Sequence, residues 1–454
     1  MRTFVIRTFG CQMNKHDSER IAGLLRAQGM RAVGDAGDAD VVVFMTCSVR
    51  ENAVERIRGQ VASLKALKTG GRPDLLIAVG GCVGQQEGEG LLRALPHVDV
   101  VFGTHNLAHL PALLESAART RRPTVEVLDS SDTFASDLPS EREHPWHAWV
   151  PLMVGCDNFC SYCIVPYVRG RERSRPIGKV VAECERLAAD GVVEVTLLGQ
   201  NVNSYGRDLY GAPRFAEALR RVAATGVRRV RFATSHPKDL SPETIAAMAE
   251  TPGVCPYLHL PVQSGSDDVL AAMNRHYTKD SYLALVERLY EAIPGLALST
   301  DIIVGFPGET DDDFAETLDV VRRCRFDQAF TFIYSPREGT KAAALTCSVP
   351  GDVVHERFDR LVELVQASAL EKNRAYVGTV RDVLWEGPSK RDESMLAGRT
   401  DTNKVVHAPC PAGHSPQSYA GSFCEVGIEA AQTWFLSGFL SGSLSGFLSG
   451  ARRA

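Results

Sequence analysis

The chain has 454 residues, of which 44% are hydrophobic and 23% are charged, so it is too long for one compact core and too apolar for a disordered or fibrous protein. Its 50 basic and 55 acidic residues give a net charge of -5, so the molecule as a whole has no positive field that would attract nucleic acid. Any such contact must use a local patch. The 12 cysteines are too dilute for a small secreted disulfide scaffold.

The N-terminal third of the sequence predicts a parallel α/β domain over 1–118. Residues 1–8 read as a short strand rather than as a cleavable leader, so we expect a cytoplasmic protein. Val-rich strands then alternate with polar helical stretches. Residues 119–145 include a segment rich in Ser, Asp, Glu and Pro that is typical of a linker.

Three cysteines of this domain each follow a predicted strand: Cys11, Cys47 and Cys82. Successive βα units place their strands in parallel, so the three thiols should emerge at the same edge of the sheet. Three thiolates with an open fourth position suit an iron-sulfur cluster that has one exchangeable iron. The alternative is that they are three ordinary buried cysteines at strand ends.

A second triad, Cys156, Cys160 and Cys163, forms a CxxxCxxC motif directly after the strand expected at 149–154. A structural zinc site needs a fourth protein ligand, and the sequence has no second CxxC to supply it. Three thiolates on one loop can instead bind three irons of a cubane and leave the fourth iron open. With the aromatic Tyr162 before the last cysteine, the motif resembles that of the radical S-adenosylmethionine superfamily, which implies that S-adenosylmethionine chelates this open iron.

Six strand-like runs with helical patterns between them predict a partial (β/α)6 barrel over 146–374; they span 149–154, 194–198, 230–234, 257–260, 297–304 and 328–334. Polar residues at or just after these strands are expected to line a pocket for S-adenosylmethionine and substrate: Gly199, Gln200, Asn201, Ser235 and Asp301. His236 and His259 are interpreted as hydrogen-bonded barrel histidines rather than as catalytic groups.

Short strands broken by turn residues predict a small β module over 375–433. The remaining residues, 434–454, contain a repeated Phe-Leu-Ser-Gly and are interpreted as a low-complexity, flexible tail. The glycine spacing of the repeat would also suit a pairing membrane helix, but the segment is too short and too polar for one.

Four arginines alternate with other residues after the second triad: Arg169, Arg171, Arg173 and Arg175. In an extended segment all four guanidinium groups would project to one side and could bind RNA phosphates. The alternative is a solvated charged strand. We favour the RNA contact because affinity for RNA depends on local neutralisation of phosphates.

The motifs together resemble the methylthiotransferase family, most closely its branch that acts on isopentenyladenosine in tRNA. The matching segments are 8–14, 46–53, 80–82, 198–203, 263–267 and 305–310, and the terminal module resembles the TRAM RNA-binding domain through 398–404. This resemblance implies that Arg399 and Lys404 contact RNA. The resemblance covers residues 1 to about 430. It implies an α/β protein with an N-terminal parallel domain, a central radical-SAM barrel and a C-terminal TRAM β-barrel.

The resemblance also implies the chemistry. Two 4Fe-4S clusters are expected, a radical-generating one at Cys156, Cys160 and Cys163 and an auxiliary one at Cys11, Cys47 and Cys82. The 5'-deoxyadenosyl radical would remove hydrogen from C2 of N6-isopentenyladenosine at position 37 of tRNA, sulfur would be inserted, and a second S-adenosylmethionine would supply the methyl group. The implied partners are tRNA, an electron donor such as flavodoxin or ferredoxin, and a sulfur source. A monomer without a membrane segment is expected.

Two alternatives remain open. The chain can be a sister methylthiotransferase that acts on threonylcarbamoyladenosine in tRNA or on an aspartate of a ribosomal protein. It can also be a non-catalytic iron-sulfur protein that binds RNA or senses redox state, in which case it would hold clusters without cleaving S-adenosylmethionine.

Overall fold

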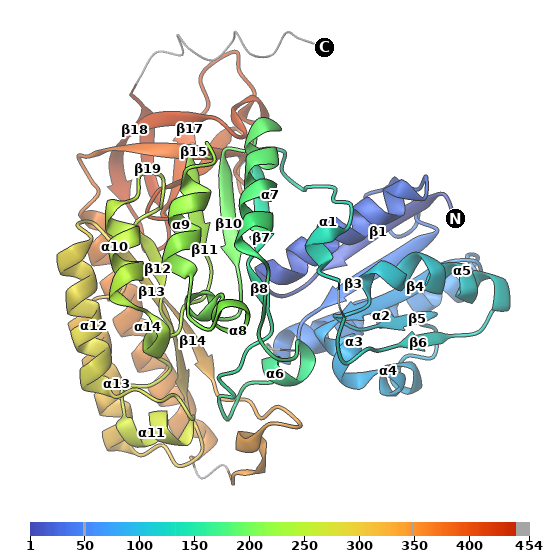
Figure 1. Cartoon of the computed structure of the whole chain (residues 1–454), viewed down its shortest axis with the longest axis horizontal. Coiled ribbons are helices and arrows are strands. Elements are labelled where there is room, and N and C mark those ends of the chain that lie inside the picture. The colour runs from blue at the N-terminus through green and yellow to red at the C-terminus, as the bar shows by residue number, and fades with distance from the viewer. Residues whose placement is uncertain (49–50, 132, 347–348, 442–454) are drawn as a thin grey trace.

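The computed structural model describes residues 1–48, 51–131, 133–346 and 349–441 (Figure 1). Its N-terminal domain is a six-stranded, all-parallel sheet in the order β2-β1-β3-β4-β5-β6. The strands are β1 Thr3–Thr8, β2 Arg31–Ala32, β3 Val41–Thr46, β4 Leu76–Gly81, β5 Val100–Phe102 and β6 Thr124–Glu126. Since β6 completes this sheet, the domain extends beyond the expected boundary at 118.

Helices cover both faces of this sheet: α1 Gln12–Ala27 and α5 Leu110–Thr120 on one face, and α2 Glu51–Thr69, α3 Cys82–Glu87 and α4 Glu89–Ala94 on the other. Every residue of β3 and of β4 is buried. Burial on both faces explains why these two strands are continuous apolar runs rather than alternating ones. The predicted parallel α/β domain is confirmed.

The segment after β6 is packed between the domains rather than free. The amide of Glu141 donates to the Glu19 carbonyl at 2.9 Å, and the Arg20 guanidinium donates to the Leu138 carbonyl at 2.8 Å. A Cβ on Gly23 would lie 2.4 Å from the Pro139 carbonyl oxygen, so α1 needs a glycine where this segment crosses it. The segment therefore helps to fix the N-terminal domain against the rest of the chain.

The central domain is the predicted partial barrel. Its six strands are all parallel and form two sheets, β11-β10-β7 and β12-β13-β14. Hydrogen bonds join the sheets, from the Cys255 amide to the Val230 carbonyl at 2.9 Å and from the Ser235 amide to the His259 carbonyl at 3.1 Å. The strands are β7 His147–Pro151, β10 Glu194–Leu198, β11 Arg229–Phe232, β12 Tyr257–His259, β13 Ala297–Val304 and β14 Gln328–Ile333.

An outer layer of helices packs on these strands (Figure 1): α7 Ile177–Ala189, α9 Phe215–Ala223, α10 Pro242–Glu250, α12 Lys279–Ala292, α13 Asp311–Cys324 and α14 Gly351–Arg374. Side-chain caps fix where several of them begin. Thr310 and Asp313 form a reciprocal capping box at the start of α13, and Thr278 and Ser281 form one at the start of α12. Shorter elements are α6 Val165–Val168, α8 Arg207–Tyr210, α11 Asp267–Ala272 and the two-residue strands β8 Met153–Val154 and β9 Arg173–Ser174.

The C-terminal module is a closed five-stranded barrel around the fully buried Trp385. Its strands are β15 Val380–Pro388, β16 Met395–Thr400, β17 Val405–Pro409, β18 Phe423–Ala431 and β19 Leu436–Leu440. β19 consists of the first Phe-Leu-Ser-Gly repeats and pairs with both β17 and β18. The expected tail boundary at 433 is therefore wrong: Leu436 and Gly438 alternate inward as the barrel needs, and residues 442–454 of the repeat lie outside the described residues.

In the part of the chain that the structure describes, no helix has the length and apolar character needed to cross a membrane.

Leu436→Ala is expected to weaken the five-stranded barrel by about 2–5 kcal/mol, because it opens a cavity in a closed core. Hydrogen exchange of the β15 and β18 amides measures the loss. Phe439→Ala, in the same strand but at a side chain that is 49% exposed, is the control and should change stability by less than ~0.5 kcal/mol. Equal protection in both variants would mean that β19 does not close the barrel in solution.

Candidate functional site

The loop that carries Cys156, Cys160 and Cys163 leaves β8 through a turn that only glycine can make. Gly155 has φ +80°, and a Cβ there would lie 2.0 Å from the Arg171 carbonyl oxygen. The Cys156 amide donates to the Gly170 carbonyl at 3.1 Å, which ties the two ends of the loop together. The loop is therefore clamped where the first cysteine begins.

The residues after α11 hold the other side of this loop. The Ser161 amide donates to the Met273 carbonyl at 3.0 Å, and the Asn274 side chain donates to the Phe159 carbonyl at 3.0 Å. The buried Arg275 guanidinium lies 3.4 Å from the Cys160 sulfur. These contacts orient the three cysteines from a segment far away in the sequence.

Burial determines the protonation of two cysteines of this triad. Burial, together with the nearby thiols of Cys160 and Cys156, raises the pKa of Cys163 to about 12, and burial raises the pKa of Cys156 to about 11. Without a cluster, the thiols of Cys156 and Cys163 are therefore neutral at physiological pH, and binding of iron must displace their protons. The Asn158 amide lies 3.5 Å from the Cys156 sulfur and can donate to it once it is a thiolate.

The other three cysteines converge at the carboxyl edge of the N-terminal sheet. Cys11 precedes α1, Cys47 follows β3 and Cys82 begins α3. A Cβ on Gly10 would lie 3.0 Å from the Cys47 sulfur, so the turn before Cys11 passes directly over Cys47. Burial raises the pKa of Cys82, and the charge of the neighbouring Cys11 raises it as well.

Within the described residues, no three His, Cys, Asp or Glu side chains come close enough together to hold a single metal ion. A cubane makes a different demand, because each thiolate binds its own iron and the three sulfurs stand further apart. The donor set of each triad, three thiolates in a mostly buried site, suits such a cluster.

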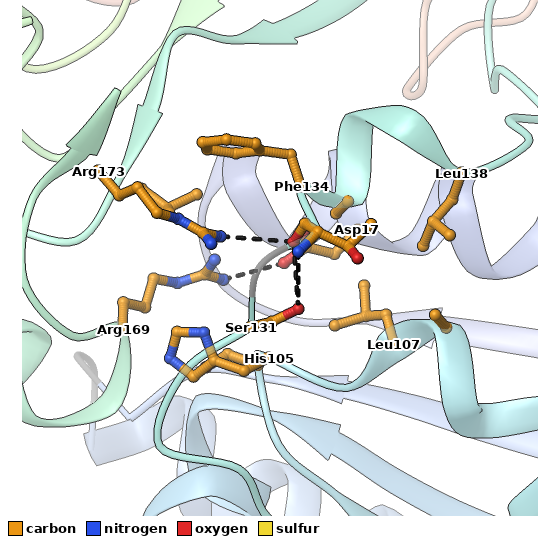
Figure 2. A pocket seen from close by; sticks show the side chains of 13 residues that line it. Asp17, His105, Leu107, Ser131, Phe134, Leu138, Arg169 and Arg173 are labelled. Atoms are coloured by element: carbon orange, nitrogen blue, oxygen red, sulfur yellow. Dashed lines mark hydrogen bonds and ion pairs between the residues drawn. The ribbon is translucent and has the colours of Figure 1, made fainter. Parts of the chain in front are cut away.

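α6 packs the loop of one triad against the site of the other triad. Cys82 packs against Ile164 and Val168, and the Thr104 hydroxyl donates to the Val168 carbonyl at 2.7 Å. Arg169, the next residue, reaches into the N-terminal domain and contacts Asp17 there (Figure 2). The loop with one triad is thus packed directly on the site of the other.

The predicted row of four exposed arginines is wrong. Arg169 and Arg175 have exposed fractions of only 6% and 3%, and the Arg175 guanidinium pairs with the Glu183 carboxylate at 2.7 Å. The row fails because Gly170, at φ +76°, turns the chain and breaks the extended geometry that one-sided alternation requires. Arg171 is exposed and pairs with Asp157, and Arg173 lies over the Phe134 ring at 4.3 Å. A role of Arg171 and Arg173 in RNA binding stays a prediction.

At the ends of β10 and β11, where the sequence predicts a pocket, five buried polar atoms have no hydrogen-bond partner among the described residues: Gln200 Oε1, Asn201 Oδ1, Asn203 Nδ2, Ser235 Oγ and His236 Nε2. Each such atom costs about 1–3 kcal/mol unless a ligand or water satisfies it. A polar cofactor such as S-adenosylmethionine fits this set. Gly199 has a packing role instead, since a Cβ there would lie 2.9 Å from Met153 Cγ.

The two barrel histidines differ. His259 is hydrogen-bonded on both nitrogens, to the Ser299 hydroxyl at 2.9 Å and to the Asp301 carboxylate at 3.3 Å, as predicted. The prediction that His236 is a fully hydrogen-bonded histidine is wrong, because its Nε2 lacks a partner in the described part of the chain. Burial lowers the pKa of His236, which keeps the ring neutral and able to accept or donate one hydrogen bond to a ligand.

The terminal module docks at the opposite end of the barrel from the cysteines (Figure 1). The Arg231 guanidinium, at the end of the barrel where β11 begins, donates to the Thr400 and Asp401 carbonyls at 2.7 and 2.9 Å. Lys404 is buried and pairs with Asp327 at 2.7 Å, so its expected contact with RNA is wrong. The Arg399 guanidinium pairs with Glu386 at 2.8 Å and remains partly exposed.

Sequence reasoning missed Arg275, Asn158 and the inward role of Arg169. Arg275 lies in a segment with no motif of its own, so only its buried position identifies it. Asn158 stands inside the CxxxCxxC motif, where an amide donor between two thiolate ligands was a readable signal.

Three family models match consecutive parts of the chain. The model described as uncharacterized protein family UPF0004 matches residues 3–103, the radical SAM superfamily model matches residues 150–321, and the TRAM domain model matches residues 374–440. The first match spans β1 to β5 of the parallel sheet, the second spans the partial barrel as far as α13, and the third spans the closed barrel.

Curated relatives match over nearly the whole chain. The tRNA-2-methylthio-N(6)-dimethylallyladenosine synthase of Acidothermus cellulolyticus is 54% identical over 410 residues, which cover 89% of this chain and 82% of the relative. The protein of the same name from Caldicellulosiruptor saccharolyticus is 50% identical over 437 residues, which cover 95% of this chain and 91% of the relative.

Solved structures share the fold at low sequence identity. The radical S-adenosylmethionine methyltransferase TsrM from Kitasatospora setae, with cobalamin and a 4Fe-4S cluster bound, superposes with a TM-score of 0.52 at 15% identity, covering 75% of this chain and 74% of TsrM. The cobalamin-dependent S-adenosylmethionine radical enzyme OxsB superposes with a TM-score of 0.50 at 14% identity, covering 81% of this chain and 56% of OxsB. At this identity the likeness establishes the fold alone.

Gly155→Ala is expected to abolish cluster assembly at the CxxxCxxC loop, because an alanine there is strained at positive φ and collides with backbone. Iron content and visible absorbance of the anaerobically loaded protein should fall to the level of Cys160→Ala. Gly178→Ala, in α7 with open space around it, is the matched control and should load like the unaltered protein. Normal iron content in Gly155→Ala would contradict the clamp.

Proposed function

Because the chain belongs to the family of tRNA-2-methylthio-N(6)-dimethylallyladenosine synthases, we propose that it attaches a methylthio group to C2 of N6-dimethylallyladenosine at position 37 of tRNA, next to the anticodon. The observation that carries the proposal is that the loop with one triad of cysteines packs, through α6, against Cys82 of a second triad in a different domain. A single thiolate triad would account for radical chemistry but would leave the sulfur step without a second site.

The reaction requires a cofactor because an unactivated aromatic C–H bond has no acidic proton that a side chain could remove. A 4Fe-4S cluster at Cys156, Cys160 and Cys163, with S-adenosylmethionine on its open iron, would supply the one-electron chemistry. Arg275 and Asn158 supply donors to the ligand sulfurs, which stabilise thiolate charge in a buried site.

The unpartnered atoms of Gln200, Asn201, Asn203, Ser235 and His236 would hold S-adenosylmethionine or the target nucleotide. Of the other predicted pocket residues, Asp301 keeps one carboxylate oxygen on His259 and is partly exposed. It can accept a hydrogen bond from a hydroxyl or an amino group of a ligand.

Cys11, Cys47 and Cys82 would hold an auxiliary 4Fe-4S cluster that handles sulfur. Their convergence at one sheet edge, with Cys11 exposed and the other two buried, supports a cluster with one accessible face. A source of sulfur and an electron donor such as flavodoxin or ferredoxin are required by the same chemistry. We place the chain in the cytoplasm, as a monomer.

The tRNA must reach from the TRAM module to the cluster loop along the side of the barrel, because the two lie at opposite ends of it (Figure 1). Three basic side chains at the docking contact already pair with carboxylates of this chain and so contribute no phosphate contacts: Arg229 with Asp382, Arg231 with Glu194 and Lys404 with Asp327. RNA binding then depends on shape and on exposed groups such as Arg171 and Arg173.

Anaerobic reconstitution with iron and sulfide, followed by S-adenosylmethionine, a reductant, a sulfide source and tRNA that carries N6-dimethylallyladenosine, should yield 5'-deoxyadenosine and the methylthiolated nucleoside by mass analysis. The same tRNA carrying threonylcarbamoyladenosine, and ribosomal protein as substrate, should remain unmodified. Turnover of either instead of the dimethylallyl substrate would assign the chain to a sister activity. Cluster binding with no 5'-deoxyadenosine on any substrate would identify a non-catalytic protein.

Cys160→Ala is expected to abolish 5'-deoxyadenosine formation, because it removes a ligand of the radical cluster. Cys47→Ala should retain deoxyadenosine formation while losing at least about tenfold of the methylthiolated product, because the two triads would perform separate steps. Cys184→Ala, at a buried cysteine of α7 that belongs to neither triad, is the control for general loss of a core thiol. Loss of deoxyadenosine in both ligand variants would contradict the division of labour.

A further inference from the structure

Arg169 reaches from the loop of one triad to the domain of the other, and the proposed reaction assigns it no role. It directly follows α6, the helix that begins just after Cys163, and its side chain points away from the barrel into the N-terminal domain (Figure 2). An arginine with an exposed fraction of 6% must be fully paired, since an unpaired buried charge is strongly destabilising.

Its partners all belong to the auxiliary site. Arg169 Nη2 lies 2.8 Å from Asn14 Oδ1 and 3.1 Å from Asp17 Oδ2, both on the first turns of α1 after Cys11. Cys82 packs against Val168, the residue directly before Arg169. A guanidinium keeps its proton at physiological pH, so Arg169 is a cation.

Asn14 and Asp17, the two partners of Arg169, are themselves held in place and so restrict its guanidinium. The Asn14 amide donates to the Phe9 and Thr46 carbonyls at 2.7 and 2.8 Å, so the acceptor that faces Arg169 is itself fixed between two of the cysteine-bearing turns. Asp17 is held by His16 at 3.1 Å. The cation therefore keeps a defined place beside Cys82 rather than a mobile one.

A buried cation in this position has a definite redox consequence. One-electron reduction adds negative charge to an iron-sulfur cluster, and a positive charge nearby stabilises the reduced form. The cation therefore raises the reduction potential, and burial strengthens the effect because water does not screen it.

We propose that Arg169 is a positioning residue that raises the reduction potential of the cluster at Cys11, Cys47 and Cys82, and that it links this potential to the conformation of the loop that carries the radical triad. The inference rests on the proposed auxiliary cluster. It predicts a property of that cluster that does not depend on turnover.

The test uses the full chain with Cys156, Cys160 and Cys163 all replaced by alanine, so that only the auxiliary site can assemble a cluster. Arg169→Gln is then titrated with a chemical reductant and followed by electron paramagnetic resonance. We expect a midpoint potential more negative than that of the parent. Arg169→Lys should shift less in the same direction, because an ammonium keeps the charge but cannot reproduce the paired contacts of the guanidinium with Asn14 and Asp17.

Arg171→Gln is the matched control, since it removes the same charge two residues away from a side chain that is exposed and paired with Asp157. Its potential should equal that of the parent. A potential in Arg169→Gln that matches Arg171→Gln would overturn the inference. If Arg169→Gln loads no cluster, the decision falls to Arg169→Lys, where an unchanged potential overturns it. A parent that assembles no cluster would instead refute the auxiliary site itself.

Discussion

Buried ion pairs between the N-terminal domain and the barrel fix the geometry on which the rest of the molecule depends. Glu183 of α7 accepts from Arg20 of α1 at 2.9 Å and pairs with Arg175 of its own domain at 2.7 Å, while Arg169 pairs with Asp17. Breaking such a buried pair costs about 3–5 kcal/mol, so the two domains have one favoured arrangement. That arrangement sets the carboxyl edges of two parallel sheets against each other.

Each half of the site is simple on its own. A parallel sheet gathers loops at its carboxyl edge, and each domain uses that edge to bring three cysteines together. α6 joins the two halves into one site. Ile164 and Val168 bury Cys82, and Arg169 extends across the domain boundary to Asn14. The cluster loop therefore carries one triad and packs against the other.

The opposite end of the barrel is closed by the TRAM module, through backbone carbonyls that accept from Arg229 and Arg231. The charge of Lys404 in the 398–404 segment serves this docking, because its ammonium group pairs with Asp327 of the barrel. The ligand end, by contrast, keeps polar atoms of Asn201 and Ser235 unpaired, which is unfavourable unless a cofactor binds there.

The sequence by itself determined the three-domain α/β organisation, the six strands of the barrel and the grouping of cysteines into two triads, because periodicity, spacing and strand ends are local properties. It could not decide which arginines reach RNA. Arg169 and Lys404 read as surface cations, and only the docking of domains made them buried ion partners. The last strand was hidden for a similar reason: a low-complexity repeat becomes β19 only because β17 and β18 leave a gap that Leu436 fills. The burial of these two cations and the formation of β19 both depend on packing between distant segments, which no local sequence pattern encodes.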